Sequence, residues 1–200
     1  METAQSDILI LIMAALGGYF LGAVPFGLLL TRLGGLGDIR TMGSGNIGAT
    51  NALRTGNKAL ATLTLLLDIG KGALAVLVFL HWGRDMAFVA AAGSLTGHIF
   101  PLWLKFRGGK GVATVLGNLL ALNWLVGLPV CITWIVIGFL SRYSSLAALV
   151  AMATAPFYSL WRDDTSMAIY TALVAILVWH QHTVNIRRLF NGEETKIGAD

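Results

Sequence analysis

The residues best suited to chemistry lie between two apolar segments, where glycines, cations and a histidine gather in one short stretch. This stretch runs Gly97-His98-Ile99-Phe100-Pro101 and then, after a brief interval, Lys105-Phe106-Arg107-Gly108-Gly109-Lys110-Gly111-Val112-Ala113-Thr114. Glycines let successive amides point into one concavity, and a helix that begins near Gly111 would turn its free amides toward the same point. The stretch therefore predicts a phosphate site to which Lys110 adds a charge. A basic turn that only sets membrane topology is the alternative.

A second polar cluster lies earlier in the chain and reads Gly43-Ser44-Gly45-Asn46-Ile47-Gly48-Ala49-Thr50-Asn51. The hydroxyl of Ser44 and the amides of Asn46 and Asn51 can hydrogen-bond to phosphate or hydroxyl oxygens. Arg54 follows with a guanidinium suited to a bidentate grip on phosphate. Ordinary turn chemistry accounts for Ser-Gly-Asn equally well, so this cluster alone does not establish a site.

Two ionisable residues stand inside an otherwise apolar segment. Asp68 and Lys71 are three positions apart, so a helix places them on one face. Each would cost about 2.5–3.5 kcal/mol if left alone at the centre of a bilayer, so we expect them to pair and to face protein or a wet cavity. The pair is either a structural link between helices or part of the substrate site.

The last cluster lies near the C-terminus. His182 and Asn185 are three positions apart and would share a helix face, with Arg188 following one turn later. Asn191-Gly192-Glu193 is typical of a helix end. A basic amphipathic tail lying on anionic lipid is the alternative to a binding role.

The composition indicates a membrane protein with several spans. Hydrophobic residues make up 56% of the 200 positions, charged residues make up 12%, and the mean hydropathy is +0.74. The net charge is +4, but no basic helix or basic-aromatic array accompanies it, so we expect no nucleic-acid partner. The single cysteine, Cys131, lies in an apolar run, and core packing is its expected role.

The apolar segments predict an all-α protein with seven transmembrane helices in a single domain, residues 1–200. Five spans are distinct: 8–31, with a bend at Pro25; 59–80, interrupted by Asp68 to Gly72; 86–100; 145–160; and 165–179. Residues 112–140 are too long for one plain span, and we interpret them as two short helices that meet near Asn123.

The basic residues support seven spans. With that number, eleven basic residues share one side of the membrane and only Arg84 and Arg162 face the other. By the positive-inside rule the richer side is the cytoplasm, so we expect the N-terminus outside and the C-terminus inside. The eleven are Arg32, Arg40, Arg54, Lys58, Lys105, Arg107, Lys110, Arg142, Arg187, Arg188 and Lys196.

Several reaction classes lack their motifs here. The four histidines are not spaced as a metal pair, and neither a Gly-x-Ser-x-Gly elbow nor a His-x-x-x-x-Asp motif occurs, so we expect no metal and no cofactor. Two other classes compete with an anion-binding enzyme. An anion transporter would need ionisable groups through the full membrane depth, and a lipid phosphatase would need a nucleophile or acidic metal site among its basic residues.

Taken together and in order, the motifs resemble those of the bacterial acyl-phosphate:glycerol-3-phosphate acyltransferases. The similarity extends from about residue 17 to residue 194. It rests on four segments: 43–51; Leu67-Asp68-Ile69-Gly70-Lys71-Gly72; 97–101 with 106–114; and His182-Thr183-Val184-Asn185-Ile186-Arg187-Arg188-Leu189 with Gly192-Glu193.

This resemblance implies transfer of a fatty acyl group from acyl phosphate to the 1-hydroxyl of glycerol 3-phosphate, giving 1-acylglycerol 3-phosphate. It also implies a bacterial inner-membrane enzyme with its active site at the cytoplasmic face, working among membrane lipids. By the resemblance Ser44, Arg54, Lys110, His182 and Asn185 bind glycerol phosphate, and we expect catalytic roles for the last three. We expect further substrate contacts from Asn46, Asn51, Asp68, Lys71, His98, Gly108, Gly109, Gly111, Thr114 and Arg188.

Overall fold

A computed structural model describes residues 2–198, and its regular elements over that range are all helices. The predicted all-α class is confirmed. The chain divides into two compact units, Met1–Leu122 and Asn123–Asp200, and each is described by itself. That residues 1–200 act as one domain stays a prediction.

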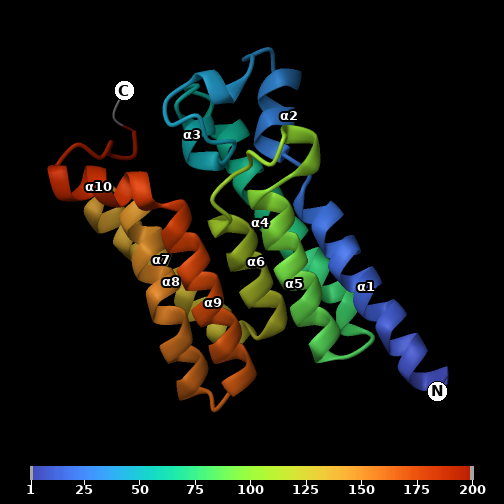
Figure 1. The fold of residues 1–200 in the computed structure, drawn as a ribbon. Helices are drawn as coiled ribbons and strands as arrows, with labels where there is room; N and C mark the ends of the chain where they lie inside the picture. Colours follow the sequence, from blue (N-terminus) through green and yellow to red (C-terminus); the bar gives the residue numbers. More distant parts are fainter. Residues whose placement is uncertain (1, 199–200) are drawn as a thin grey trace. The chain divides into compact units, whose positions relative to one another are not determined.

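The first unit is built from two pairs of helices that pack closely. Its elements are α1 (Glu2–Gly22), α2 (Phe26–Leu33), η1 (Ile39–Thr41), α3 (Ala49–Leu53), α4 (Lys58–Leu80), α5 (Arg84–Ile99), η2 (Leu102–Leu104) and α6 (Val112–Leu122). Figure 1 shows α1 beside α5 and α4 beside α6. Glycines permit this approach, since a Cβ on Gly22 would overlap the Ser94 carbonyl and one on Gly117 the Ile69 carbonyl.

The predicted bend in the first span is present between α1 and α2. Pro25 has no amide hydrogen, so the helix cannot continue through it. Side chains from elsewhere in the unit satisfy two carbonyl groups at the break. Trp103 Nε1 donates to Ala23 O at 2.8 Å, and Lys71 Nζ donates to Val24 O at 2.8 Å.

Helix α4 runs without interruption through Asp68 to Gly72, so this polar stretch interrupts the apolar sequence but not the helix, and Asp68 and Lys71 lie on one helix as expected. Two glycines there weaken the helix by up to about 1 kcal/mol each relative to alanine. Gly72 lies against the Thr114 carbonyl of α6, so the position that lowers helix propensity also allows close helix packing.

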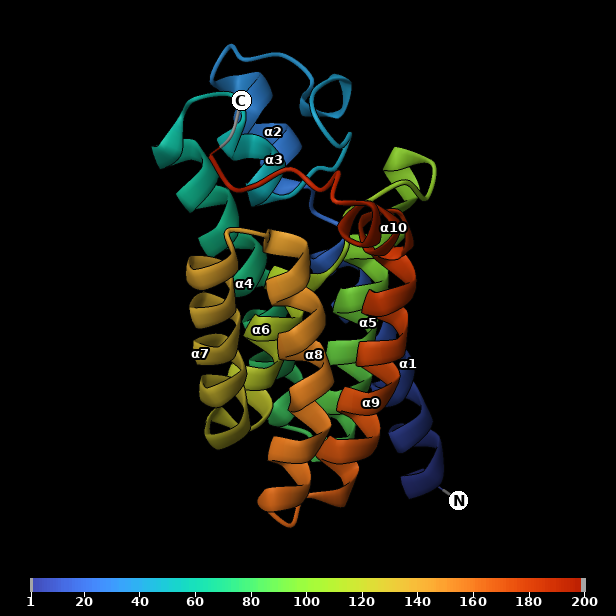
Figure 2. The same cartoon turned by 90° about the vertical axis from the view of Figure 1, so that its left-hand side faces the viewer.

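The second unit contains α7 (Trp124–Ser141), α8 (Ser144–Trp161), α9 (Thr165–Gln181) and α10 (Thr183–Asn191). Helix α8 packs against both α7 and α9 (Figure 2). Asn123 precedes α7, and its side chain accepts a hydrogen bond from Leu125 N at 3.1 Å. The predicted helix break near Asn123 is therefore confirmed, as is the stop at Gly192, which follows α10 with a φ of 71°.

Five helical segments of the described chain are long and apolar enough to cross a membrane. They are Asp7–Leu33, Lys58–Leu80, Arg84–Leu104, Trp124–Ser141 and Ser144–Trp161. Helices α9 and α10, bent by 64° at His182, make a sixth if taken together, and α6 is a shorter apolar helix. The protein is an integral membrane protein by these segments, and seven spans remain a prediction.

Candidate active site

The loop before α3 is organised around the buried side chain of Asn51. Its Nδ2 donates to three carbonyl oxygens, those of Ile39, Met42 and Asn46, at 2.7–3.1 Å. Its Oδ1 accepts from Ser44 N at 3.2 Å. Asn51 is only 2% exposed, and its side chain is enclosed by these contacts with the loop. It fixes the loop and thereby positions Ser44.

Ser44 and Arg54 lie on the accessible side of this loop. The Ser44 side chain is exposed, Arg54 is half-buried, and the Arg54 side chain packs against Gly43. Gly43 has a φ of 52°, and a Cβ there would overlap the guanidinium, so glycine is required on both counts. Asn46 turns inward and accepts from Gly48 N at 3.2 Å.

An exposed ion-pair cluster stabilises the start of the same loop. Asp38 contacts Arg40 at 2.6 Å and Arg32 at 2.8 Å. Hydrogen bonding from Arg40, with a smaller contribution from Arg32, lowers the pKa of Asp38 far below its usual value. The carboxylate also accepts from the Arg40 amide at the start of η1. Arg32 and Arg40 are thus partly neutralised, which leaves Arg54 as the cation next to Ser44.

Asp68 and Lys71 form the predicted pair inside α4. Lys71 Nζ lies 2.6 Å from Asp68 Oδ1, and each side chain is 3% exposed. Lys71 also donates to the carbonyl freed at the α1–α2 break, and it lies 5.7 Å from the centre of the Phe26 ring. The pair therefore links α4 to the bend in the first span, so part of its role is structural.

His98 extends this buried group from α5. Its Nδ1 lies 3.8 Å from Asp68 Oδ1, and its side chain is 4% exposed. His98 Nδ1, Asp68 Oδ1 and Thr114 Oγ1 are buried atoms without a well-oriented hydrogen-bond partner among the described residues. Buried polar atoms are usually hydrogen-bonded, so water or a ligand atom is the ordinary partner of atoms such as His98 Nδ1 and Thr114 Oγ1.

The glycine-rich loop folds back on the end of α5. Gly108 N donates to Ile99 O and Gly109 N to His98 O, each at 3.0 Å. A Cβ on Gly108 would overlap the His98 carbonyl, and a Cβ on Gly109 would overlap the His98 ring. These two glycines therefore serve close packing, and their amides are already engaged rather than available to a phosphate.

Lys110 and the start of α6 retain the anion-binding character expected of the loop. Gly111 has a φ of 85°, and α6 begins at the next residue, as predicted. The first-turn amides of a helix have no carbonyl partner within it, and they carry its positive dipole end. Lys110 is half-buried and lies two positions before the first residue of α6. The chemistry of this part of the loop therefore suits an anion better than that of Gly108 and Gly109.

In the second unit, His182 forms the corner between α9 and α10. Its side chain is 3% exposed, and Nδ1 lies 2.8 Å from Val178 O. A carbonyl only accepts, so this contact places the proton of the neutral ring on Nδ1 and the lone pair on Nε2. The corner thereby orients the basic nitrogen.

Asn185 lies one turn into α10 and is held by a residue that the sequence motifs did not single out. Glu194 Oε1 accepts from Asn185 Nδ2 and from Ser145 Oγ, each at 2.7 Å. Asn185 is 8% exposed, while Arg188 is half-buried. The predicted helix end at Gly192 was a partial indication of this contact, because the chain turns back toward α10 after it. Only the fold shows that Glu194, and not Glu193, accepts the hydrogen bond from Asn185.

The predicted site residues fall into two sets. The first unit contains Ser44, Asn46, Asn51 and Arg54 in one loop and brings Asp68, Lys71, His98, Gly108 and Gly109 into contact around the end of α5. The second unit contains His182, Asn185 and Arg188. The chain is an integral membrane protein with five membrane-length segments among the described residues. Its cations, amides and oriented histidine are binding groups suited to anionic substrates.

Comparisons with known proteins agree with this class. The family model described as glycerol-3-phosphate acyltransferase matches residues 12–192. A glycerol-3-phosphate acyltransferase of Rhodospirillum rubrum is 54% identical over 200 residues, covering 96% of this chain and 93% of the relative. The chain belongs to the glycerol-3-phosphate acyltransferase family.

Solved structures of the integral membrane glycerol 3-phosphate acyltransferase PlsY are also similar. Its glycerol 3-phosphate form is 33% identical with a TM-score of 0.87, and its lysophosphatidic acid form is 32% identical with a TM-score of 0.85. Each alignment covers 96% of both chains.

Proposed function

We propose that this protein transfers a fatty acyl group from acyl phosphate to the 1-hydroxyl of sn-glycerol 3-phosphate. The products are 1-acylglycerol 3-phosphate (lysophosphatidic acid) and inorganic phosphate, and the reaction is the first acylation of phospholipid biosynthesis. Family membership supports the acceptor. The observation that carries the proposal is the placement of Lys110 at the α6 N-terminus, a cationic cradle for phosphate.

The residue chemistry supports acyl phosphate as the donor. An acyl phosphate is an activated mixed anhydride, so the enzyme needs no covalent nucleophile. It must bring two phosphate-bearing substrates together against their repulsion, which cations and preorganised amides achieve. Lys110, Arg54 and Arg188 are the cations that we assign to this task.

In the proposed step, the glycerol hydroxyl oxygen attacks the acyl carbonyl carbon directly. The new ester C–O bond forms as the bond from that carbon to the phosphate oxygen breaks, and phosphate leaves against Lys110 and the α6 amides. The proton passes to His182 Nε2 or to a substrate phosphate oxygen. Asn185 holds the glycerol phosphate beside His182, and Ser44 and Arg54 bind its phosphate.

We assign contact or positioning roles to the remaining predicted residues. Asn51 and Asn46 shape the loop that carries Ser44. Gly108, Gly109 and Gly111 set the path of the loop before α6. Asp68, Lys71, His98 and Thr114 are buried, and we place a substrate oxygen or water beside His98 Nδ1 and Thr114 Oγ1, which have no hydrogen-bond partner among the described residues.

We also propose that the chain crosses the bacterial inner membrane seven times as one catalytic domain. The N-terminus then lies outside, and the active site and C-terminus lie at the cytoplasmic face. The basic residues support this topology, since eleven share the cytoplasmic side and two face the other.

Purified protein given palmitoyl phosphate and glycerol 3-phosphate tests the reaction. We expect phosphate release matched by lysophosphatidic acid, and no lysophosphatidic acid when palmitoyl-CoA replaces palmitoyl phosphate. Phosphate release that needs no acceptor would instead identify an acyl phosphatase. Formation of lysophosphatidic acid from palmitoyl-CoA at a comparable rate would contradict the assignment of acyl phosphate as the donor.

The proton acceptor is tested separately with His182→Gln. If His182 Nε2 is the base, kcat falls by about 10²–10⁴-fold in a protein that still unfolds at the wild-type temperature. A kcat close to wild type would assign the proton to a substrate phosphate oxygen.

A further inference from the structure

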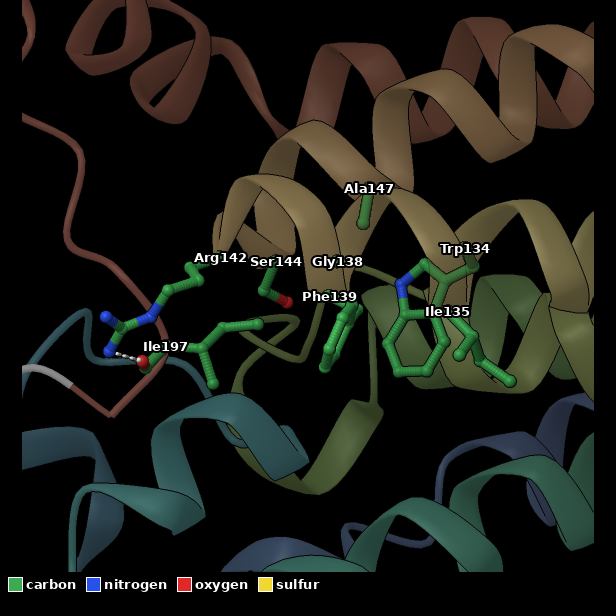
Figure 3. A pocket seen from close by; sticks show the side chains of 8 residues that line it. All are labelled: Trp134, Ile135, Gly138, Phe139, Arg142, Ser144, Ala147 and Ile197. Atoms are coloured by element: carbon green, nitrogen blue, oxygen red, sulfur yellow. Dashed lines mark hydrogen bonds between the residues drawn. The ribbon is translucent and has the colours of Figure 1, made fainter.

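The second unit contains a cavity of about 430 Å³ whose lining residues have no part in the proposed reaction. It lies where α7 ends and α8 begins, and Figure 3 shows the side chains around it. Trp134, Ile135, Gly138 and Phe139 line it from α7, and Arg142 and Ser144 line it from the turn that follows. The volume is within the usual range of small-molecule sites, about 300–1,000 Å³.

The α7 side of the cavity is suited to a hydrocarbon chain. Ile135 is 60% exposed and Phe139 is 81% exposed, on a helix apolar enough to cross the membrane. Gly138 leaves room between them, because a Cβ there would meet only the Cβ of Ala147, at an ordinary contact distance of 3.6 Å. The cavity therefore exists partly because position 138 has no side chain.

The other end of the cavity is cationic. Arg142 Nη2 donates to Ile197 O at 3.1 Å, the dashed contact in Figure 3, and a guanidinium has five N–H donors in all. The nearby carboxylate of Glu194 is engaged by Ser145 and Asn185. Helix α8 begins after Tyr143 without a side-chain cap, so its first-turn amides add positive potential at the same end.

We propose that this cavity binds one phospholipid of the surrounding membrane whose headgroup carries a net negative charge. One acyl chain lies along Trp134, Ile135 and Phe139. The headgroup phosphate accepts hydrogen bonds from Arg142 and the first amides of α8. Charge complementarity at the end of an apolar groove favours an anionic lipid over a zwitterionic one. The site is independent of the proposed reaction, because none of its residues is assigned to it.

Quenching of tryptophan fluorescence by brominated lipid tests the proposal. The full-length protein in dodecyl maltoside micelles is titrated with phosphatidylglycerol or phosphatidylcholine brominated on the acyl chain. The signal of Trp134 is the difference between wild type and Trp134→Phe. We expect half-maximal quenching at a mole fraction of phosphatidylglycerol about fivefold lower than for phosphatidylcholine.

Matched variants separate the two ends of the cavity. Gly138→Leu fills the groove and abolishes saturable quenching by both lipids, while Gly138→Ala has a smaller effect in the same direction. Phe139→Ala removes an exposed side chain that lines the cavity, and it weakens quenching by both lipids. Arg142→Gln removes the preference for phosphatidylglycerol, Arg142→Lys retains it, and Arg162→Gln at the far end of α8 leaves it unchanged.

Two outcomes would overturn the proposal. Equal quenching by the two lipids, unchanged in Gly138→Leu, would show only the ordinary lipid contact of a membrane helix. The second outcome would assign the cavity to the acyl donor. In that case a palmitoyl phosphonate displaces brominated phosphatidylglycerol, and Gly138→Leu raises the KM for palmitoyl phosphate while kcat is unchanged. The quenching titrations do not require the proposed reaction to be correct, since they measure lipid binding without turnover.

Discussion

The glycine-rich loop after α5 and the corner between α9 and α10 hold predicted site residues in opposite ways. In the loop, missing side chains let the backbone of Gly108 and Gly109 press against His98. At the corner, Glu194 holds Asn185 through a side-chain hydrogen bond, and a second bond anchors it to Ser145. The loop should therefore be sensitive to added atoms, and the corner to lost hydrogen bonds.

This comparison teaches that two sets of binding residues need different kinds of support. A loop that packs directly on backbone atoms cannot accommodate an added side chain, because carbonyl groups at a helix end cannot move independently of the helix. A side chain held by a carboxylate depends on one acceptor and tolerates changes in its surroundings that leave this acceptor in place. Substitutions in the loop, in the buried pair behind it, at the corner and at Asp38 should differ in the size of their effects.

The largest effect is expected from Gly108→Ala. Its Cβ would overlap the His98 carbonyl, so the loop must move and carry Lys110 with it. A displacement of about 1 Å at a reacting centre can cost about 100-fold in rate, and we expect at least that loss of phosphate release from palmitoyl phosphate. Gly70→Ala is the control, since Gly70 lies on the exposed surface of α4 and a Cβ there meets nothing within 4 Å. Equal activity of the two variants would contradict the packing argument.

The next effect concerns the buried pair behind the loop. Asp68→Ala leaves Lys71 buried without its carboxylate, and breaking a buried ion pair typically destabilises a protein by about 3–5 kcal/mol. We expect a loss of this size in reversible unfolding in mixed micelles. The exchange Asp68→Lys with Lys71→Asp should recover only part of it, because aspartate at position 71 cannot donate to Val24 O. Full recovery would show that the link to the α1–α2 break contributes little.

A smaller loss is expected at the corner. Glu194→Ala removes the acceptor shared by Asn185 and Ser145, and an unsatisfied buried donor costs about 1–3 kcal/mol. We expect a lower unfolding temperature together with a raised KM for glycerol 3-phosphate. Glu193→Ala is the matched control, since Glu193 is exposed and its side chain accepts a long hydrogen bond of 3.5 Å from Asn191 Nδ2. Identical behaviour of the two variants would contradict the assigned role.

The smallest effect is expected at Asp38, which lies in neither the loop nor the corner. Because its pKa is lowered in the folded protein, ionised Asp38 stabilises the fold above its ordinary pKa of about 3.9. This stability is lost as the pH falls below that value toward the lowered pKa. The group is partly exposed, so Asp38→Asn should cost less than about 1 kcal/mol at pH 7. The free energy of unfolding of wild type and of Asp38→Asn should be measured at pH 7 and pH 3, and the difference between the two proteins should be smaller at pH 3. A difference that does not change with pH would exclude a contribution from ionised Asp38.

Much of the fold followed from local patterns. The helix break near Asn123, the bend at Pro25, the start of α6 and the stop at Gly192 each depend on a residue type that acts on its own backbone. In span 59–80 the polar stretch Asp68 to Gly72 interrupts the apolar pattern, but the helix is continuous. Helix α4 continues there because packing against α6 compensates for weak local propensity.

The candidate site was predictable as a set of residues but not as a set of roles. Lys110, His182 and Asn185 could be chosen by type and motif. The sequence could not show that the amides of Gly108 and Gly109 donate to carbonyl groups of α5 rather than to a phosphate, because both arrangements require glycine. Glu194 was missed because its neighbour Glu193 has the same chemistry, and only the return of the chain after Gly192 buries one of them.

The sequence by itself determined the membrane class, the helices, and contacts within one helical turn, such as the Asp68–Lys71 pair. Such contacts follow from the 3.6-residue period and need no knowledge of the rest of the chain. Only the tertiary structure decided that Lys71 reaches Val24, that Gly109 meets His98, and that Glu194 holds Asn185 together with Ser145. These contacts depend on which faces of rigid helices pack together, and that choice is made by the whole packed unit rather than by any segment.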